Sequence, residues 1–113
     1  MLKTLSLTFT LFLATVLFAL SSEAITEEGP GKQLFEKHCL KCHGDDGRGD
    51  TKIGQLTKTP DLNEHPWKRG DTLEDLIKLI TEGEGKMPKP KKISQEEIET
   101  VAAYTLERFL PKP

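Results

Sequence analysis

The sequence predicts an all-α domain whose helices are joined by long loops. Two segments in the second half of the chain place apolar residues at helical spacing and carry capping residues at their ends. No segment shows the alternation of apolar and polar residues that is typical of a β-strand, and no internal repeat is visible. These observations together indicate the all-α class.

The clearest helical pattern covers residues 72–82, where Thr72 is a candidate N-cap and Gly83 is a stop signal. Its apolar positions recur every three or four residues, which is the spacing of one helix face. They are Leu73, Leu76, Ile77 and Ile80. We expect this face to pack against the rest of the domain.

A final helix is expected from Gln95 to Phe109, because Ser94 and Glu97 form the pattern of a capping box. Its apolar stripe consists of Ile98, Val101, Ala102, Thr105 and Phe109. An earlier helix is expected over residues 32–41, opened by Gly31 and carrying Phe35 as a core residue. The segments 25–30, 51–70 and 84–92 lack helical periodicity and are expected to be irregular.

The first 24 residues have the layout of a secretory signal peptide. Lys3 precedes an apolar run from Leu5 to Leu20, and small residues lead to a cleavage site after Ala24. A retained membrane anchor is the alternative, but the run is shorter than the roughly 20 apolar residues that span a bilayer. We therefore expect a signal peptide at 1–24, one exported domain at 25–113 and a periplasmic location.

The two cysteines of the chain lie in the run Cys39-Leu40-Lys41-Cys42-His43. On a helix, Cys39 and Cys42 lie one turn apart on the same face. Two thiols at this spacing can bond to the two vinyl groups of a haem while His43 ligates its iron, and the run Cys-x-x-Cys-His is the attachment signature of c-type haem. The sequence therefore predicts one covalent haem c.

Two other chemistries are open to this cysteine pair. A disulfide is common in exported proteins, but one between Cys39 and Cys42 would close a very short loop and stabilise little. The disulfide would also leave His43 unexplained, and a zinc or thiol-redox module is the weakest alternative. Calcium binding by the acidic loop after His43 is not expected, because the twelve-residue loop that ends in a bidentate Glu is missing.

The second axial ligand of the iron is expected to be Met87. It is the only methionine after residue 24, and it lies in a loop stiffened by Pro88. His38 and His65 are the rivals, and Trp67 is expected either to donate its indole N–H to a haem propionate or simply to pack. A thioether ligand favours ferrous iron and leaves no open position for oxygen or peroxide, which favours electron transfer over catalysis.

These motifs resemble the small monohaem class I cytochromes c of bacteria. The matching residues are Gly31 and Phe35, Cys39 to Gly44, Gly47 and Gly49, Pro60-Asp61-Leu62, Leu76-Ile77 with Gly83, Met87-Pro88, and Val101 to Tyr104. The resemblance implies three to five helices wrapped around one haem, with thioether links from Cys39 and Cys42 and axial ligands from His43 and Met87. It also implies that the first and last helices cross, with Phe35 packed near Tyr104 at a close approach that Gly31 permits.

The expected function is one-electron transfer in the periplasm, with no enzyme activity. The alternatives are a cytochrome subunit of a periplasmic dehydrogenase or oxidase and, less favoured, a haem-based sensor or peroxidase. Exposed basic residues around Met87 suggest a docking face for an acidic redox partner: Lys86, Lys89, Lys91 and Lys92. The net charge of −2 gives no sign of nucleic-acid binding, and the domain at 25–113 is not expected to span a membrane.

Overall fold

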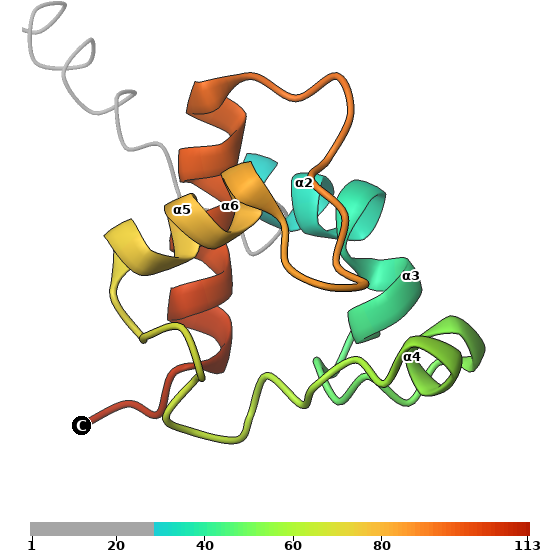
Figure 1. Cartoon of the computed structure of the whole chain (residues 1–113). Helices are drawn as coiled ribbons and strands as arrows, with labels where there is room; N and C mark the ends of the chain where they lie inside the picture. Colours follow the sequence, from blue (N-terminus) through green and yellow to red (C-terminus); the bar gives the residue numbers. More distant parts are fainter. Residues whose placement is uncertain (1–28) are drawn as a thin grey trace, which may run out of the picture.

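The computed structural model describes residues 29–113, and this part of the chain is all-α (Figure 1). Its helices are α2 (Pro30–His38), α3 (Leu40–His43), α4 (Lys52–Thr57), α5 (Leu73–Glu82) and α6 (Gln95–Phe109). Among these residues the only β-type pairing is an isolated bridge between Glu84 and Met87. The predicted signal peptide lies outside the described residues. None of the helices within 29–113 has the length and apolar character needed to cross a bilayer.

The two strongest helix predictions are confirmed, caps included. In α5 the Thr72 hydroxyl accepts a hydrogen bond from the backbone N–H of Asp75, and the Asp75 carboxylate accepts one from the N–H of Thr72. In α6 Ser94 and Glu97 form the same reciprocal pair. Capping boxes satisfy backbone donors that the first helical turn leaves free, so each helix begins where its cap lies.

The first predicted helix is interrupted in the structure. It begins at Pro30, two residues before the predicted start, and α2 ends at His38, where Cys39 turns out of the helix with φ −119°. The short helix α3 follows at once and carries Cys42 and His43. Because of this break, Cys42 and His43 do not continue the line of α2. The apolar periodicity of the sequence does not reveal the break.

The prediction that residues 51–70 are wholly irregular is wrong in its first part, because Lys52–Thr57 forms α4. The Thr51 hydroxyl caps this helix by accepting a hydrogen bond from the N–H of Gly54 (2.9 Å). Among the residues of α4, Gly54 alone is buried, and Leu56 remains 71% exposed. A six-residue helix with so little buried apolar surface has no periodic stripe to reveal it.

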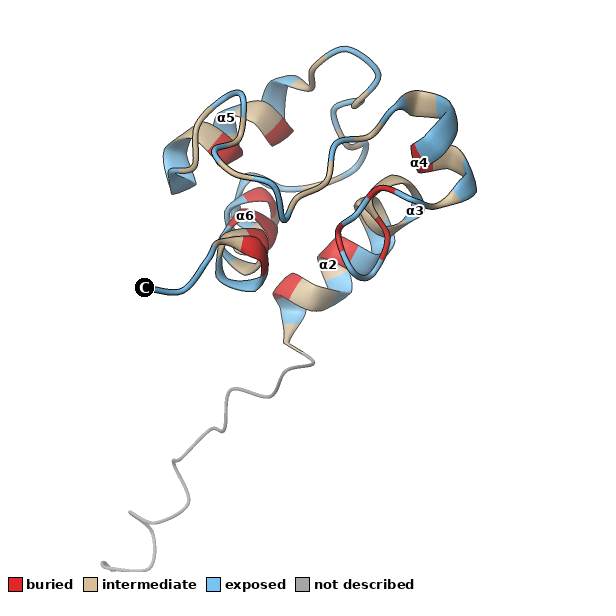
Figure 2. Cartoon of the chain, turned by 90° about the horizontal axis from the view of Figure 1, so that it is seen from below, coloured by how far each residue is buried: buried red, intermediate tan, exposed pale blue. Residues whose placement is uncertain are grey.

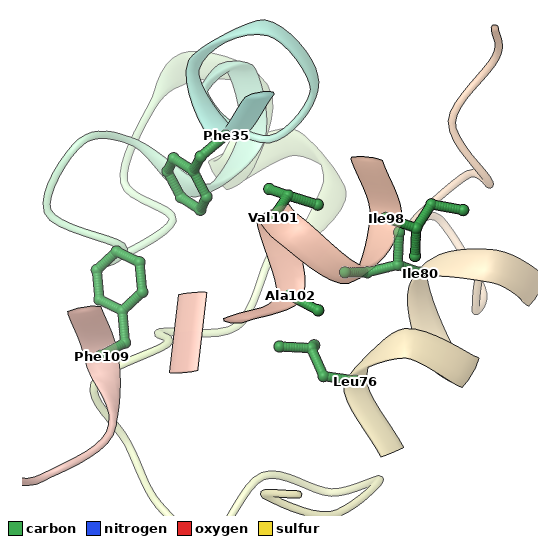
Figure 3. Close-up of a cluster of buried hydrophobic side chains, with 7 residues drawn as sticks. All are labelled: Phe35, Leu76, Ile80, Ile98, Val101, Ala102 and Phe109. Atoms are coloured by element: carbon green, nitrogen blue, oxygen red, sulfur yellow. The ribbon is translucent and has the colours of Figure 1, made fainter. Parts of the chain in front are cut away.

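The core lies where α6 passes between α2 and α5 (Figure 2). Leu76 and Ile80 on α5 point toward Ala102 and Ile98 on α6, and Val101 faces the side of Phe35 (Figure 3). The seven buried apolar residues are Phe35, Leu76, Ile80, Ile98, Val101, Ala102 and Phe109. Each large side chain buried in this way stabilises the fold by about 1.5–3 kcal/mol.

The crossing of α2 and α6 has the expected form. A Cβ on Gly31 would lie 2.6 Å from the Cβ of Tyr104, a distance that real Cβ contacts do not reach, so only glycine fits here. The rings of Phe35 and Tyr104 lie 5.7 Å apart between centroids, and Phe109 lies 5.6 Å from Phe35 on its other side. The resemblance to class I cytochromes c is thus matched by the helix crossing itself.

Candidate functional site

A cavity of about 680 Å³ opens between the helical core and the two long loops. Its inner wall is apolar and is formed by core residues, among them Phe35, Leu76, Ile80 and Val101. All four predicted site residues also line this cavity: Cys39, Cys42, His43 and Met87. Residues 48 positions apart in the sequence, Cys39 and Met87, therefore face one common space.

The Cys39–His43 segment is a tight turn followed by one turn of helix. The N–H groups of Cys42 and His43 both donate to the carbonyl of Cys39, at 3.3 and 3.0 Å. The two thiols are half-buried, and neither is in a disulfide. Burial, with a smaller contribution from the neighbouring Cys42, raises the pKa of the Cys39 thiol to about 11.

Helix α4 and its N-cap residue contact the backbone of the Cys39–His43 segment. The Thr51 hydroxyl donates to the carbonyls of Lys41 (2.7 Å) and Cys42 (3.1 Å), while its oxygen caps α4. Gly54 lies so close that a Cβ there would collide with the carbonyl oxygens of Cys42 and Gly49. Neither role was predicted, because the only local signal in the sequence was a threonine positioned to cap a short helix.

His43 is half-buried, and its surroundings favour the neutral ring. Burial lowers the pKa of His43, since a charged imidazolium is poorly solvated there. The ring nitrogen Nδ1 is buried and has no hydrogen-bond partner among the described residues. The backbone is fixed separately, because the carbonyl of His43 accepts a 2.8 Å hydrogen bond from the N–H of Gly49. A neutral imidazole is the form that binds metals.

Met87 lies on the opposite loop, which joins α5 to α6. Two backbone hydrogen bonds pair it with Glu84: Glu84 N–H to the Met87 carbonyl at 2.9 Å, and Met87 N–H to the Glu84 carbonyl at 2.8 Å. Glu84 also forms a partly exposed ion pair with Arg69 at 3.5 Å. Met87 is half-buried and packs against the core, as its place beside the cavity requires.

The rival residues are placed differently. Nε2 of His65 lies 2.9 Å from the carbonyl of Phe109, so this nitrogen carries a proton and is engaged. His38 lines the cavity, and its Nε2 is buried without a partner among the described residues. The indole N–H of Trp67 donates to the carbonyl of Leu62 (3.0 Å), so this donor has a partner within the chain.

The residues around the cavity fit a haem. The volume lies within the 300–1,000 Å³ range of cofactor sites, and the inner wall is apolar, as a porphyrin face requires. A neutral imidazole with an orphaned buried nitrogen and two unpaired thiols lie on the same wall segment. Within residues 29–113, no group of three or more His, Cys, Asp or Glu side chains is arranged to hold a bare metal ion.

A sequence model of cytochrome c oxidase, cbb3-type, subunit III matches residues 27–104 of this chain. The chain belongs to this family. It is a small monohaem c-type cytochrome with the all-α fold of class I, and it carries a covalently bound haem c with iron. Its general role is that of an electron-carrying cytochrome.

Two kinds of relative resemble this cytochrome. It is 30% identical to the cbb3-type cytochrome c oxidase subunit CcoP of Azospirillum brasilense over 86 residues, which cover 74% of this chain and 29% of that protein. It is 32% identical to cytochrome c6 of Leptolyngbya boryana over 81 residues, which cover 69% of this chain and 88% of that protein. The chain thus spans less than a third of that oxidase subunit. No solved structure matches it.

Proposed function

We propose that this cytochrome is an exported one-electron carrier in which Cys39 and Cys42 hold the haem through thioether bonds and His43 and Met87 bind its iron. The observation that carries the proposal is that these four side chains line one cavity, although they come from two segments far apart in the sequence. Residues 1–24 act as the signal peptide that delivers the chain to the periplasm.

Bound in this cavity, the haem iron supplies a one-electron couple. The chain contributes the environment: an apolar wall that excludes water, a neutral imidazole from His43 and a thioether from Met87. A thioether ligand raises the reduction potential relative to a second histidine. With both axial positions filled by side chains, no position is left for a substrate, which favours a carrier over a sensor or peroxidase.

Carbon monoxide tests this assignment on the reduced protein. We expect slow and weak binding, because Met87 must first leave the iron, and fast binding in Met87→Ala. Leu79→Ala is the matched control, since Leu79 also lines the cavity and packs against the core but has no sulfur. Rapid binding by the unaltered protein would contradict the carrier and support a haem-based sensor or peroxidase.

The partner of this carrier is an acidic redox protein that docks on the lysine face, defined as Lys86, Lys89, Lys91 and Lys92. All four side chains are exposed, and within the described residues none forms an ion pair. Lys86 lies on the cavity wall beside Met87, so docking here places a partner near the haem. Unpaired surface charges of one sign accelerate the encounter of proteins at low ionic strength.

Reversal of charge on this face tests the docking proposal. Lys89→Glu with Lys91→Glu is expected to slow electron transfer with the physiological partner about tenfold at low salt and little at high salt. The matched control is Lys32→Glu, at a half-buried lysine on α2 that is already paired with Glu36 at 3.9 Å. Equal effects of the two variants, or a rate indifferent to ionic strength, would contradict the lysine face.

The second candidate is a cytochrome subunit of an oxidase. It is favoured by the relatives that are named as subunits of cbb3-type oxidases, with which this chain shares one domain. A stable complex that copurifies with the protein from membranes would support it. Isolation of the cytochrome alone, active in exchange with a diffusing partner, supports the free carrier.

A further inference from the structure

Helix α4 turns its leucine outward and its glycine inward. Gly54 is the buried residue of this helix and lies against the backbone of the haem-attachment motif. At 3.6 residues per turn, a residue two positions further on points about 200° away, to the opposite side of the helix. Leu56 is accordingly 71% exposed, whereas the apolar face of a surface helix ordinarily packs on the core. The fold therefore gains little stability from Leu56.

Large apolar side chains are seldom so exposed in this protein. Within residues 29–113 there is one other in the exposed class, Leu73 on α5, at 42%. Helices α4 and α5 lie at opposite sides of the molecule in both views (Figures 1 and 2). Leu73 does not line the cavity, whereas Thr57 and Lys58, which follow Leu56 directly, do. A single exposed leucine is ordinary on a protein surface, so the charges near Leu56 decide what it fits.

The charges near Leu56 are positive and unpaired. Residues 51–59 include Lys52 and Lys58 and no acidic residue. Lys52 precedes Leu56 by four positions and so lies on the same side of the helix. Lys58 follows the helix and lines the cavity together with Lys41 of α3. All three lysines are exposed, and none of them forms an ion pair with a described residue.

Lys58 adopts a backbone conformation that favours glycine. Its φ of 55° and ψ of 46° are left-handed, and a side chain destabilises this conformation at the end of a helix. Within the described part of the chain, Lys92 of the lysine face is the other non-glycine residue with positive φ. A strained residue near a functional site indicates a role for its side chain beyond the fold. Both strained residues here are exposed lysines.

We propose that Lys52, Leu56 and Lys58 form a second docking patch, the α4 patch, for the acidic redox partner that binds the lysine face. Leu56 packs into an apolar depression of that partner, and the two lysines pair with carboxylates at its rim. The inference rests on the proposed carrier function. An apolar centre with a polar rim is the usual arrangement of a protein interface. The lysines accelerate the encounter, whereas Leu56 slows dissociation.

The test follows oxidation of the reduced cytochrome by membranes of the organism that makes it, at several cytochrome concentrations. Leu56→Ser should raise the KM about tenfold at low and at high salt, because an apolar contact is not screened. The kcat, the reduction potential and the unfolding temperature should stay as they are, since Leu56 contacts solvent and not the core. Leu73→Ser is the matched control and should leave the KM unaltered.

Lys58→Gly separates docking from folding. The rate at low salt should fall about two- to threefold, because one attractive charge is lost. The unfolding temperature should rise, because glycine adopts the left-handed conformation without strain. Opposite changes in rate and stability are not expected of a lysine that acts only in the fold. Lys58→Arg keeps the charge and the side chain, so it should keep both the rate and the unfolding temperature.

Unaltered kinetics in Leu56→Ser and Lys58→Gly, with transfer still slowed by the paired Lys89→Glu and Lys91→Glu substitutions, would overturn the α4 patch and leave the carrier intact. So would equal effects of Leu56→Ser and Leu73→Ser, or a slower Leu56→Ser protein whose reduction potential or unfolding temperature has also changed. Membranes that do not oxidise the unaltered reduced protein would contradict the carrier proposal and this inference with it.

Discussion

The two segments that would present the iron ligands, helix α3 with His43 and the loop with Met87, are held in place differently. On the His43 side, the motif is held by the Gly49 N–H, by the Thr51 hydroxyl and by close packing against Gly54. On the Met87 side, two backbone hydrogen bonds to Glu84 and one partly exposed ion pair from Arg69 hold the loop. The His43 side is therefore fixed against a second helix, α4, whereas the Met87 loop is held against the end of α5, where a Cβ on Gly83 would lie 2.8 Å from the Met87 carbonyl oxygen.

The difference indicates which of the two sides opens first. Short hydrogen bonds and buried glycines leave the His43 side one conformation, and covalent attachment would add to that rigidity. Regions with few buried contacts and exposed hydrogen bonds open at lower free-energy cost. We therefore expect the Met87 loop to unfold locally first when the protein is heated, acidified or exposed to an external ligand. The His43 side should keep its structure until the whole domain unfolds.

The largest effect should come from one methyl group on the His43 side. Gly54→Ala places a Cβ against the carbonyl oxygens of Cys42 and Gly49, which are backbone atoms and cannot swing aside. We expect a loss of about 3 kcal/mol or more in unfolding free energy, measured by denaturant titration of the haem-loaded protein.

Gly85→Ala is its counterpart on the Met87 side. A Cβ there meets nothing within 4 Å, and only the backbone angle of +56° opposes it. The cost should be roughly 1–2 kcal/mol, the usual penalty for a left-handed residue with a side chain. Equal losses from Gly54→Ala and Gly85→Ala would show that the two sides are not packed differently.

A smaller effect is expected from Glu84→Gln, which removes the ion pair with Arg69. Exposed pairs contribute at most about 1 kcal/mol, so the unfolding free energy should hardly change. Displacement of Met87 by added imidazole should become easier by up to about fivefold, the factor that 1 kcal/mol represents. Glu36→Gln, which removes the surface pair with Lys32, is the control and should leave imidazole binding unaltered.

The smallest effect concerns the start of α6, where the Met87 loop ends. Hydrogen bonds from the backbone and then the side chain of Ser94 lower the pKa of Glu97 below its ordinary value of 4.5. Stabilisation by the Glu97 carboxylate is therefore present above pH 4.5 and is lost as pH falls through the lower folded value.

Thermal unfolding at several pH values checks this direction. Glu97→Gln should lower the unfolding temperature slightly at neutral pH, and the difference from the unaltered protein should shrink in acid. Glu99→Gln, on the same helix, should show no such convergence. A difference between Glu97→Gln and the unaltered protein that grew on acidification would contradict the sign.

Local sequence signals predicted the helices that are stabilised by their own caps and apolar faces. α5 and α6 carry an apolar stripe and a capping box each, so Thr72 and Ser94 marked their starts. α4 was missed because it is held from outside: Thr51 bonds to carbonyls ten and nine residues earlier, and Leu56 remains exposed. The break at Cys39 was missed because the helical pattern continues through it.

In the candidate site, too, local motifs were predictable from the sequence and tertiary contacts were not. Cys39, Cys42 and His43 form a contiguous motif, and Met87 stood out as a lone methionine beside a proline. Their shared cavity is a product of tertiary structure and could only be expected from family resemblance. The partners of His65 were beyond sequence reasoning, because the Phe109 carbonyl is 44 residues away and belongs to the backbone.

The far-red absorption spectrum of the oxidised protein tests the central claim most directly, since a methionine sulfur bound to ferric haem gives a band there. We expect this band in the unaltered protein and in Leu79→Ala, and its loss in Met87→Ala. That loss should accompany a fall in reduction potential on the order of 0.1 V. An unaltered protein without the band, or a Met87→Ala protein that retains it, would contradict ligation by Met87.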